Sequence, residues 1–201
     1  MISQPLRLGF LASGAGSSAR AIVAAIEAGA LDAEARLMVS NNRTAEALAF
    51  AAEHGIAALC IPTQAEPAAA DRRLSEALTG HGVELIVLSG YLRQLGPAAL
   101  GRYAGRVLNI HPGPLPQFGG HGMYGRRVHE AVLAAGVAES GICIHLVDEE
   151  YDRGPVIARR SVEVRPGDTP ESLEARVRAL EPGFFVQSLQ RIAEGSLDLP
   201  R

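Results

Sequence analysis

The fold of the chain is set by LRLGFLASGAGSSARAIVAAIEA, residues 6–28. Its apolar start, residues 6–12, predicts a buried strand, and its Ala- and Ile-rich end, residues 17–28, has the spacing of a helix packed behind that strand. Between them, residues 13–18 form a turn of small side chains, where unpaired amides and the positive end of the helix converge. The stretch therefore predicts the first βα unit of an α/β sheet, with either a phosphate site or a tight turn without a ligand at its bend.

The same turn fits the loose dinucleotide fingerprint G-x-G-x-x-A over residues 14–19, a weak signal when it stands alone. A second strand is predicted over residues 36–40 and ends in Asn41 and Asn42. A dinucleotide enzyme would carry Asp or Glu there to bind the ribose hydroxyls. The missing acid favours a single phosphate on a small substrate over a dinucleotide.

Helices and strands alternate beyond this unit. The pattern of apolar residues predicts helices at 44–53, 67–79 and 127–135, a short helix from Pro97, and strands at 57–61, 84–89 and 106–110. Such a series predicts an α/β fold with a Rossmann-like, doubly wound, mostly parallel sheet flanked by helices. Later strands at 142–147 and 156–164, joined by an acidic turn, predict an antiparallel hairpin that extends the sheet.

The chain is predicted to finish with two helices. Pro170, capped by Thr169, opens the first, which runs to about Leu180. The Glu-Pro pair that follows is expected to end it, because proline lacks the N–H that a helix interior needs. A last helix is predicted over 184–194.

Composition excludes several classes of function. The 201 residues are 47% hydrophobic and 20% charged, as in an ordinary soluble globular domain, and the formal net charge of −3 gives no reason to expect nucleic acid or a membrane as partner. All 19 basic residues are arginines, which excludes a P-loop lysine and a Schiff-base lysine. No stretch has the pattern of a signal peptide or a membrane span, so a cytoplasmic location is expected. Cys60 and Cys143 are expected to be buried, reduced thiols.

Two polar residues stand at the end of a strand in VLNIHP, residues 107–112. Asn109 and His111 are two apart and point to the same face, and Pro112 stops the strand. The carboxyl ends of strands are where open α/β sheets bind ligands. Asp152, in the acidic turn of the predicted hairpin, can be brought to the same place.

These three residues suit acyl transfer. A buried carboxylate is expected to raise the pKa of His111 toward or above neutrality, so that the ring can donate a proton to an oxygen that becomes negative. The amide of Asn109 supplies a second donor. The sequence has no G-x-S-x-G motif, no plausible catalytic Cys and no metal-ligand cluster, so we expect direct attack of a substrate's own nucleophile on a carbonyl. Singly, each residue has a structural alternative: a loop-bonding Asn, a satisfied His or a turn-forming Asp.

Other features are assigned supporting roles. His145 alternates with apolar positions and is expected to be a buried polar residue that supports the site. His121 is expected to make a loop contact, and the glycine-rich residues 119–125 to form a loop of the kind that closes over substrates. The remaining histidines are expected to be surface or helix residues: His54, His81 and His129.

Three motifs together resemble the folate-dependent formyltransferases: Ser13-Gly14-x-Gly16-Ser17, Asn109-Ile110-His111-Pro112 followed by Leu115-Pro116, and Asp152-x-Gly154-Pro155. The match covers nearly the whole chain in order, and the early turn is most similar to the members that act on glycinamide ribonucleotide. The resemblance implies transfer of a formyl group from 10-formyltetrahydrofolate, as co-substrate and without a metal, to the amine of that ribonucleotide in purine biosynthesis. It implies small-molecule partners only, and a chain that is a monomer or homodimer.

The resemblance also implies a role for each site residue. His111 would be the general acid, Asn109 would bind the formyl oxygen, and Asp152 would raise the pKa of His111 and help relay the amine's proton. One domain, 1–201, is expected, with approximate lobes 1–104 for the phosphoribosyl substrate and 105–201 for catalysis and folate. The ribonucleotide would contact Gly16, Ser17, Ser18, Arg178 and Glu181. The folate would contact Leu92, Arg93, Gln94, Leu95, Asn109, Asp148, Glu149, Glu150, Tyr151 and Asp152.

The sequence departs from the family pattern in places, and other functions are open. Ser18 stands where the family's turn usually has Asn, and Gly113-Pro114 replaces the usual Ser-Leu. The alternatives are another formyl transfer or a formyl hydrolysis on the same folate, a nucleotide-binding oxidoreductase, or a non-catalytic binding module. Asn41 counts against the oxidoreductase, and the joint presence of the three polar residues counts against the binding module.

Overall fold

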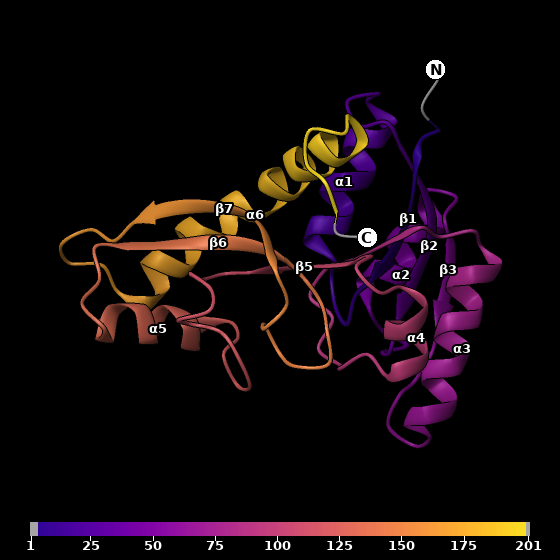
Figure 1. Ribbon diagram of the computed structural model, residues 1–201, viewed down its shortest axis with the longest axis horizontal. Coiled ribbons are helices and arrows are strands. Elements are labelled where there is room, and N and C mark those ends of the chain that lie inside the picture. The colour runs from indigo at the N-terminus through magenta and orange to yellow at the C-terminus, as the bar shows by residue number, and fades with distance from the viewer. Residues whose placement is uncertain (1–3, 200–201) are drawn as a thin grey trace.

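The computed structural model describes residues 4–199, which form one seven-stranded sheet with helices packed on both faces (Figure 1). Across the sheet the strands follow the order β3-β2-β1-β4-β5-β6-β7. In chain order the elements are β1 (Leu6–Leu11), α1 (Ser17–Glu27), β2 (Ala33–Ser40), α2 (Glu46–Glu53), β3 (Ala57–Cys60), α3 (Pro67–Gly80), β4 (Leu85–Leu88), α4 (Pro97–Arg102), β5 (Val107–His111), α5 (Arg126–Ala134), β6 (Glu139–Leu146), β7 (Val156–Glu163) and α6 (Pro170–Ala193).

The sheet is mixed, as predicted. Strands β1 to β5 run parallel to one another, and β6 runs antiparallel to both β5 and β7. The chain builds from β1 outward to β3, then returns to place β4 on the other side of β1. Ligands of open α/β sheets bind outside the carboxyl ends of the strands at such a switch point. The turns that follow β1 and β4 border this position.

Side chains of the central strands alternate between two apolar cores. In β4, Leu85 and Val87 enter a core with α1, α2, α5 and α6, while Ile86 and Leu88 enter a core with α3 and α4. Successive side chains of a strand point to opposite faces, and here both faces are covered. This is why the strand is apolar at every position.

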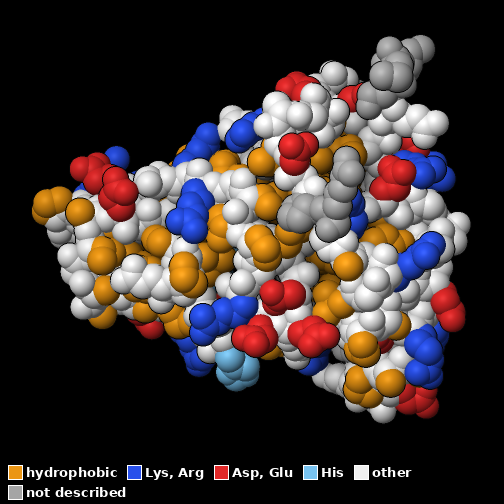
Figure 2. Space-filling model, in the orientation of Figure 1, with side chains coloured by type: hydrophobic (Ala, Val, Ile, Leu, Met, Phe, Trp, Pro, Cys, Tyr) orange, Lys and Arg blue, Asp and Glu red, His pale blue; other side chains and the backbone are white. Residues whose placement is uncertain are grey.

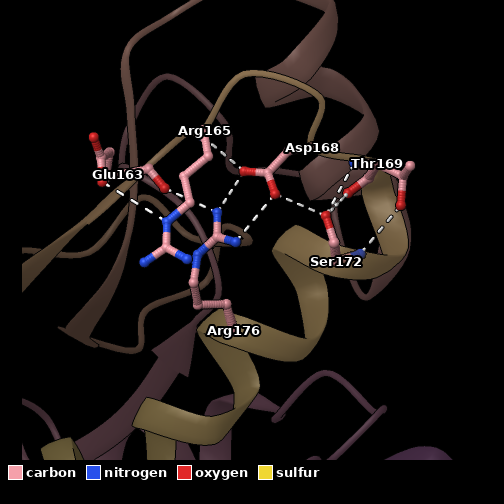
Figure 3. Close-up of polar contacts among 6 residues, drawn as sticks. All are labelled: Glu163, Arg165, Asp168, Thr169, Ser172 and Arg176. Atoms are coloured by element: carbon pink, nitrogen blue, oxygen red, sulfur yellow. Dashed lines mark hydrogen bonds and ion pairs between the residues drawn. The ribbon is translucent and has the colours of Figure 1, made fainter.

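A polar network fixes the start of α6 (Figure 3). The Thr169 hydroxyl accepts from the Ser172 N–H at 3.2 Å, and the Ser172 hydroxyl accepts from the Thr169 N–H at 3.0 Å, which makes a capping box. Asp168 accepts from the Arg165 N–H at 2.8 Å and from the guanidinium of Arg176. The helix therefore begins where the sequence predicts.

The expectation that a Glu-Pro pair divides the last segment into two helices is wrong. One helix runs from Pro170 to Ala193 with Pro182 inside it. An interior proline costs about 3 kcal/mol. Burial of a large apolar side chain contributes about 2 kcal/mol. The helix buries five of them, two before the proline and three after it: Leu173, Val177, Phe184, Phe185 and Leu189. Packing therefore outweighs the lost hydrogen bond.

The remaining elements match the predictions with small shifts. Strands β2 and β6 begin at Ala33 and Glu139, earlier than the predicted residues 36 and 142. The connection between β6 and β7, residues 147–155, is longer than a tight turn. Cys143 is buried in β6, and Cys60 is half-buried at the end of β3. Within residues 4–199, no helix has the length and apolar character needed to cross a membrane.

Candidate active site

Four polar side chains meet where β5 and β6 pair. Asn109 and His111 lie on one face of β5, and the antiparallel register sets Asn109 opposite His145 of β6. Nδ2 of Asn109 is 3.1 Å from Nε2 of His145. Asp152 comes from the β6–β7 connection, with its Oδ1 3.4 Å from His145 Nε2 and its Oδ2 3.5 Å from His111 Nδ1. The structure thus brings together the three residues singled out from the sequence and adds His145.

Hydrogen bonds assign the protons of this group. His145 Nδ1 lies 2.9 Å from the carbonyl oxygen of Leu146, which can only accept, so Nδ1 carries a hydrogen. In the neutral ring, Nε2 then accepts from Nδ2 of Asn109. Since an amide nitrogen has two hydrogens, Asn109 keeps one for another acceptor.

His111 is held in the same way by the loop that follows it. The ring is 3% exposed, and its Nε2 donates to the carbonyl oxygen of Phe118 at 2.7 Å. In the neutral ring, Nδ1 therefore carries the free lone pair, and this nitrogen faces Asp152. Any proton that His111 gains or loses in a reaction is carried on Nδ1.

The expected rise in the pKa of His111 is wrong. Burial lowers the pKa of the ring below its usual value, and the nearby His145 lowers it further. Asp152 and the Phe118 carbonyl act in the opposite direction but are outweighed. His111 is therefore neutral at pH 7 in the free protein.

Asp152 is ionised, and its backbone is unusual. Burial raises the pKa of this carboxyl, but the nearby rings of His145 and His111 and the N–H of Gly120 at 3.1 Å lower the pKa by more. Asp152 has φ of 57°, the one left-handed non-glycine residue among those described. Such strain concentrates at functional sites.

Two glycines allow the backbone to approach this carboxylate closely. A Cβ on Gly119 would lie 2.9 Å from Cβ of Asp152 and would also collide with Leu115. A Cβ on Gly154 would overlap the carbonyl oxygen of Leu146 at the end of β6. The small residues around Asp152 are therefore required by packing.

A cavity of about 70 Å³ opens beside the polar group. Its lining includes eight residues of the predicted folate set: Arg93, Gln94, Leu95, Asn109, Asp148, Glu150, Tyr151 and Asp152. Leu92 is 72% exposed and Glu149 is also exposed, and neither lines the cavity. Instead, the carbonyl oxygen of Glu149 accepts a hydrogen bond from Nε2 of Gln94 at 2.7 Å, which joins the two walls.

Sequence reasoning left four lining residues out of the folate set: Leu88, Tyr91, His145 and Val147. Leu88 and Val147 lie at the carboxyl end of β4 and directly after β6, so their place at the ends of apolar strands is the signal that could have found them. His111 does not line the cavity but lies behind Asp152. The rim is acidic, and Figure 2 shows acidic side chains gathered below the centre of the sheet, where the exposed β6–β7 connection lies.

The turn between β1 and α1 has the form of an anion site. Gly16, in the left-handed region with φ of 67°, starts the helix without a side-chain cap. Ser89 accepts from the N–H of Ala19 at 3.0 Å. Within residues 4–199, no acceptor meets the N–H groups of Ser17 and Ser18. Ser17 is exposed and Ser18 is buried.

Arg178 and Glu181 lie on α6, which packs against α1. The guanidinium of Arg178 is 3.9 Å from Glu174 and largely exposed. Burial raises the pKa of Glu181 to about 7. The positive charge of Arg178 opposes this rise only in part, and the nearby Glu174 adds to it. In the described chain, no hydrogen bond or ion pair joins either residue to the turn at residues 13–18.

The other histidines take varied positions. At the surface, Nδ1 of His54 is within hydrogen-bond distance of Oε1 of Glu27, at 2.6 Å, and His121 packs edge-on against Tyr151. His129 is in a helix, one of its two expected settings, but it is fully buried there, and neither ring nitrogen has a hydrogen-bond partner among the described residues. Burial lowers the pKa of His129, so the ring is neutral.

Comparison with known proteins gives one consistent result. A family described as formyl transferase matches residues 6–189. The chain is 37% identical over 191 residues to the chloroplastic phosphoribosylglycinamide formyltransferase of Arabidopsis thaliana, covering 94% of this chain and 65% of that protein. It is 35% identical over 183 residues to the phosphoribosylglycinamide formyltransferase of Bacillus subtilis, covering 90% and 91%. The chain spans less than two thirds of the length of the plant relatives, 65% and 61%.

Solved structures agree with this relationship. The phosphoribosylglycinamide formyltransferase of Coxiella burnetii has the same fold with a TM-score of 0.88 and 36% identity, covering 98% of this chain and 91% of that chain. The likeness therefore covers the whole sheet and its helices.

Proposed function

Because this chain belongs to the formyl transferase family, we propose that it transfers the formyl group of 10-formyltetrahydrofolate to the amino group of glycinamide ribonucleotide, a step of purine biosynthesis. The observation that carries the proposal is the meeting of Asn109, His111 and Asp152 beside a cavity at the carboxyl end of β5. The names of relatives such as the Bacillus subtilis protein support this choice of substrates.

Asn109 stabilises the negative oxygen of the tetrahedral intermediate. One Nδ2 hydrogen is used by His145, and the second is free to donate to the formyl oxygen. A donor that is already oriented needs no reorganisation as the charge develops, and loss of one such donor costs about 3 kcal/mol of barrier. His145 acts as a positioning residue for this amide.

His111 takes up the proton of the attacking amine. The amine nitrogen forms a bond to the formyl carbon, and its proton passes by way of the Asp152 carboxylate, which lines the cavity, to the free Nδ1 of the neutral ring behind it. The imidazolium then lies 3.5 Å from the ionised Asp152, which stabilises it. When the intermediate collapses, the bond from the formyl carbon to N10 of the folate breaks and His111 returns the proton to N10. The residue expected to be an acid is thus a base first and an acid second.

The substrates occupy sites that differ in form. The turn at residues 14–18 holds the phosphate through backbone N–H groups, and Arg178 and Glu181 contact the ribonucleotide from α6. The pterin enters where the lobe of residues 1–104 meets the lobe of residues 105–201. Ligand pockets usually measure several hundred Å³, so the cavity of about 70 Å³ must widen.

A coupled assay tests the proposal. Tetrahydrofolate release from 10-formyltetrahydrofolate is followed with and without glycinamide ribonucleotide. Release that requires the ribonucleotide, with one formyl group transferred per folate, is expected. Release at the same rate without the ribonucleotide would identify a deformylase instead, and no release under either condition would contradict both activities.

A further inference from the structure

Ser13, the second residue after the end of β1, joins three loops. Its hydroxyl donates to Oδ1 of Asn41 at 2.6 Å and accepts from the N–H of Leu92 at 2.9 Å. Its N–H donates to the carbonyl oxygen of Gly90 at 3.1 Å, and its carbonyl accepts from Nδ2 of Asn42 at 3.4 Å. Because these partners follow β2 and β4, one serine joins the carboxyl ends of three strands at the switch point of the sheet.

This serine stands between the two sites of the proposed function. The residues that follow it, 14–18, are the phosphate turn. On its other side, the Ser13 hydroxyl accepts from the N–H of Leu92. The next residues, Arg93, Gln94 and Leu95, line the cavity and form the wall that faces Ser13. The wall continues through the hydrogen bond of Gln94 to Glu149, three residues before Asp152. An unbroken run of backbone and hydrogen bonds therefore leads from the phosphate turn to the reacting group.

We propose that Ser13 is a positioning residue that couples binding of the ribonucleotide to binding of the folate. The inference rests on the proposed function and adds a dependence between its two substrates. A phosphate on the turn orders Ser13, and the hydroxyl then holds Leu92 and the wall in the conformation that receives the folate. By linkage, the folate tightens binding of the ribonucleotide by the same factor.

The hydroxyl is the group that the structure requires. Alanine at this position would leave the Leu92 N–H and the Asn41 amide oxygen without their partner, while the backbone bonds to Gly90 and Asn42 would remain. Loss of one or two hydrogen bonds between neutral groups weakens binding by about five- to thirtyfold. The effect should fall on folate affinity rather than on the chemical step, because Ser13 makes no contact with Asn109, His111 or Asp152.

The test compares Ser13→Ala with Ser13→Thr, which keeps a hydroxyl. Ser75→Ala is the matched control, since the Ser75 hydroxyl donates to the carbonyl oxygen of Ala98 at 3.3 Å and also joins two segments of the same lobe. Tetrahydrofolate is titrated by calorimetry into each full-length protein, with and without saturating glycinamide ribonucleotide. Thermal unfolding of each variant shows that the fold is retained.

In the unsubstituted chain, the ribonucleotide should tighten tetrahydrofolate binding about tenfold. Ser13→Ala should reduce that factor to near one and raise the KM for the formyl donor with kcat little changed, while Ser13→Thr and Ser75→Ala keep the factor. Retention of the full factor in Ser13→Ala, or its absence in the unsubstituted chain, would overturn the inference while formyl transfer still stands. A chain that binds neither ligand would overturn the proposed function as well.

Discussion

Replacement of Asp152 by Asn tests the electrostatic part of the mechanism. Asp152 Oδ2 is 3.5 Å from His111 Nδ1, and at an effective dielectric constant of about 20 a carboxylate attracts an imidazolium at that distance by about 5 kcal/mol. The neutral amide keeps its shape and part of this interaction through its dipole. We therefore expect kcat to fall by about a hundred- to a thousandfold, which corresponds to about 3 to 4 kcal/mol of barrier.

The variant should fold, because its backbone suits the new residue. Asp152 has φ of 57°, and Asn is among the residues that adopt the left-handed region most readily. The amide oxygen can still accept from the N–H of Gly120, as the carboxylate does at 3.1 Å. Asp32→Asn is the matched control, since it removes one carboxylate from an exposed residue directly before β2.

The pH dependence of kcat separates the two roles of His111. A neutral ring that takes up a proton gives a rate that falls below about pH 6.5, because the pKa of His111 is lowered by burial. Asp152→Asn removes the charge that opposes this lowering, so the acid limb should move to still lower pH. A rate that falls as the pH rises through neutrality, or an Asp152→Asn variant within threefold of the unsubstituted enzyme, would refute the reasoning.

Three further changes test packing and burial. The pKa of Glu181 is raised from 4.5 to about 7, so between these pH values the folded chain holds a proton that the unfolded chain releases, and the stability of the fold decreases as the pH rises through this range. Glu181→Gln should therefore stabilise the fold at pH 8 by at most about 3 kcal/mol and not at pH 5, as measured by urea unfolding at both pH values. Gly154→Ala should reduce stability and activity together, because its Cβ would overlap the carbonyl oxygen of Leu146; an active variant with unchanged melting temperature would contradict the close approach. Thr169→Ala removes the acceptor of the Ser172 N–H and should cost about 1 kcal/mol of stability while kcat stays unchanged, and a loss of kcat would show that the start of α6 contributes to the site.

Local patterns were enough to predict most elements and the polar trio. The alternation of strands and helices follows from the spacing of apolar residues along the chain. The observed boundaries differ from the predicted ones by only a few residues, as at the start of β2. Asn109 and His111 share a face because any strand alternates its side chains. The same reasoning failed at Pro182. There the local tendency of proline to end a helix is outweighed by apolar side chains of α6 that pack against segments distant in the sequence.

The candidate site was predicted in its composition but not in its charges. From the sequence, a carboxylate near His111 implied a raised pKa. The structure buries the ring to 3% exposure and ties Nε2 to the Phe118 carbonyl, so desolvation outweighs the carboxylate. The pKa depends on the balance of burial and charge, and neither term is a property of a residue's neighbours in the sequence.

By itself the sequence determined the order of strands and helices, the turn of small residues after β1, and the identity of the polar groups, because each follows from interactions between residues close along the chain. Only the tertiary structure decided that His145 completes the group, that Asp152 reaches it from a strained connection, and that one serine joins the two proposed substrate sites. Those contacts join residues up to 79 positions apart. They exist only when the pairing of β5 with β6, and of β1 with β2 and β4, brings distant strand ends to one edge of the sheet.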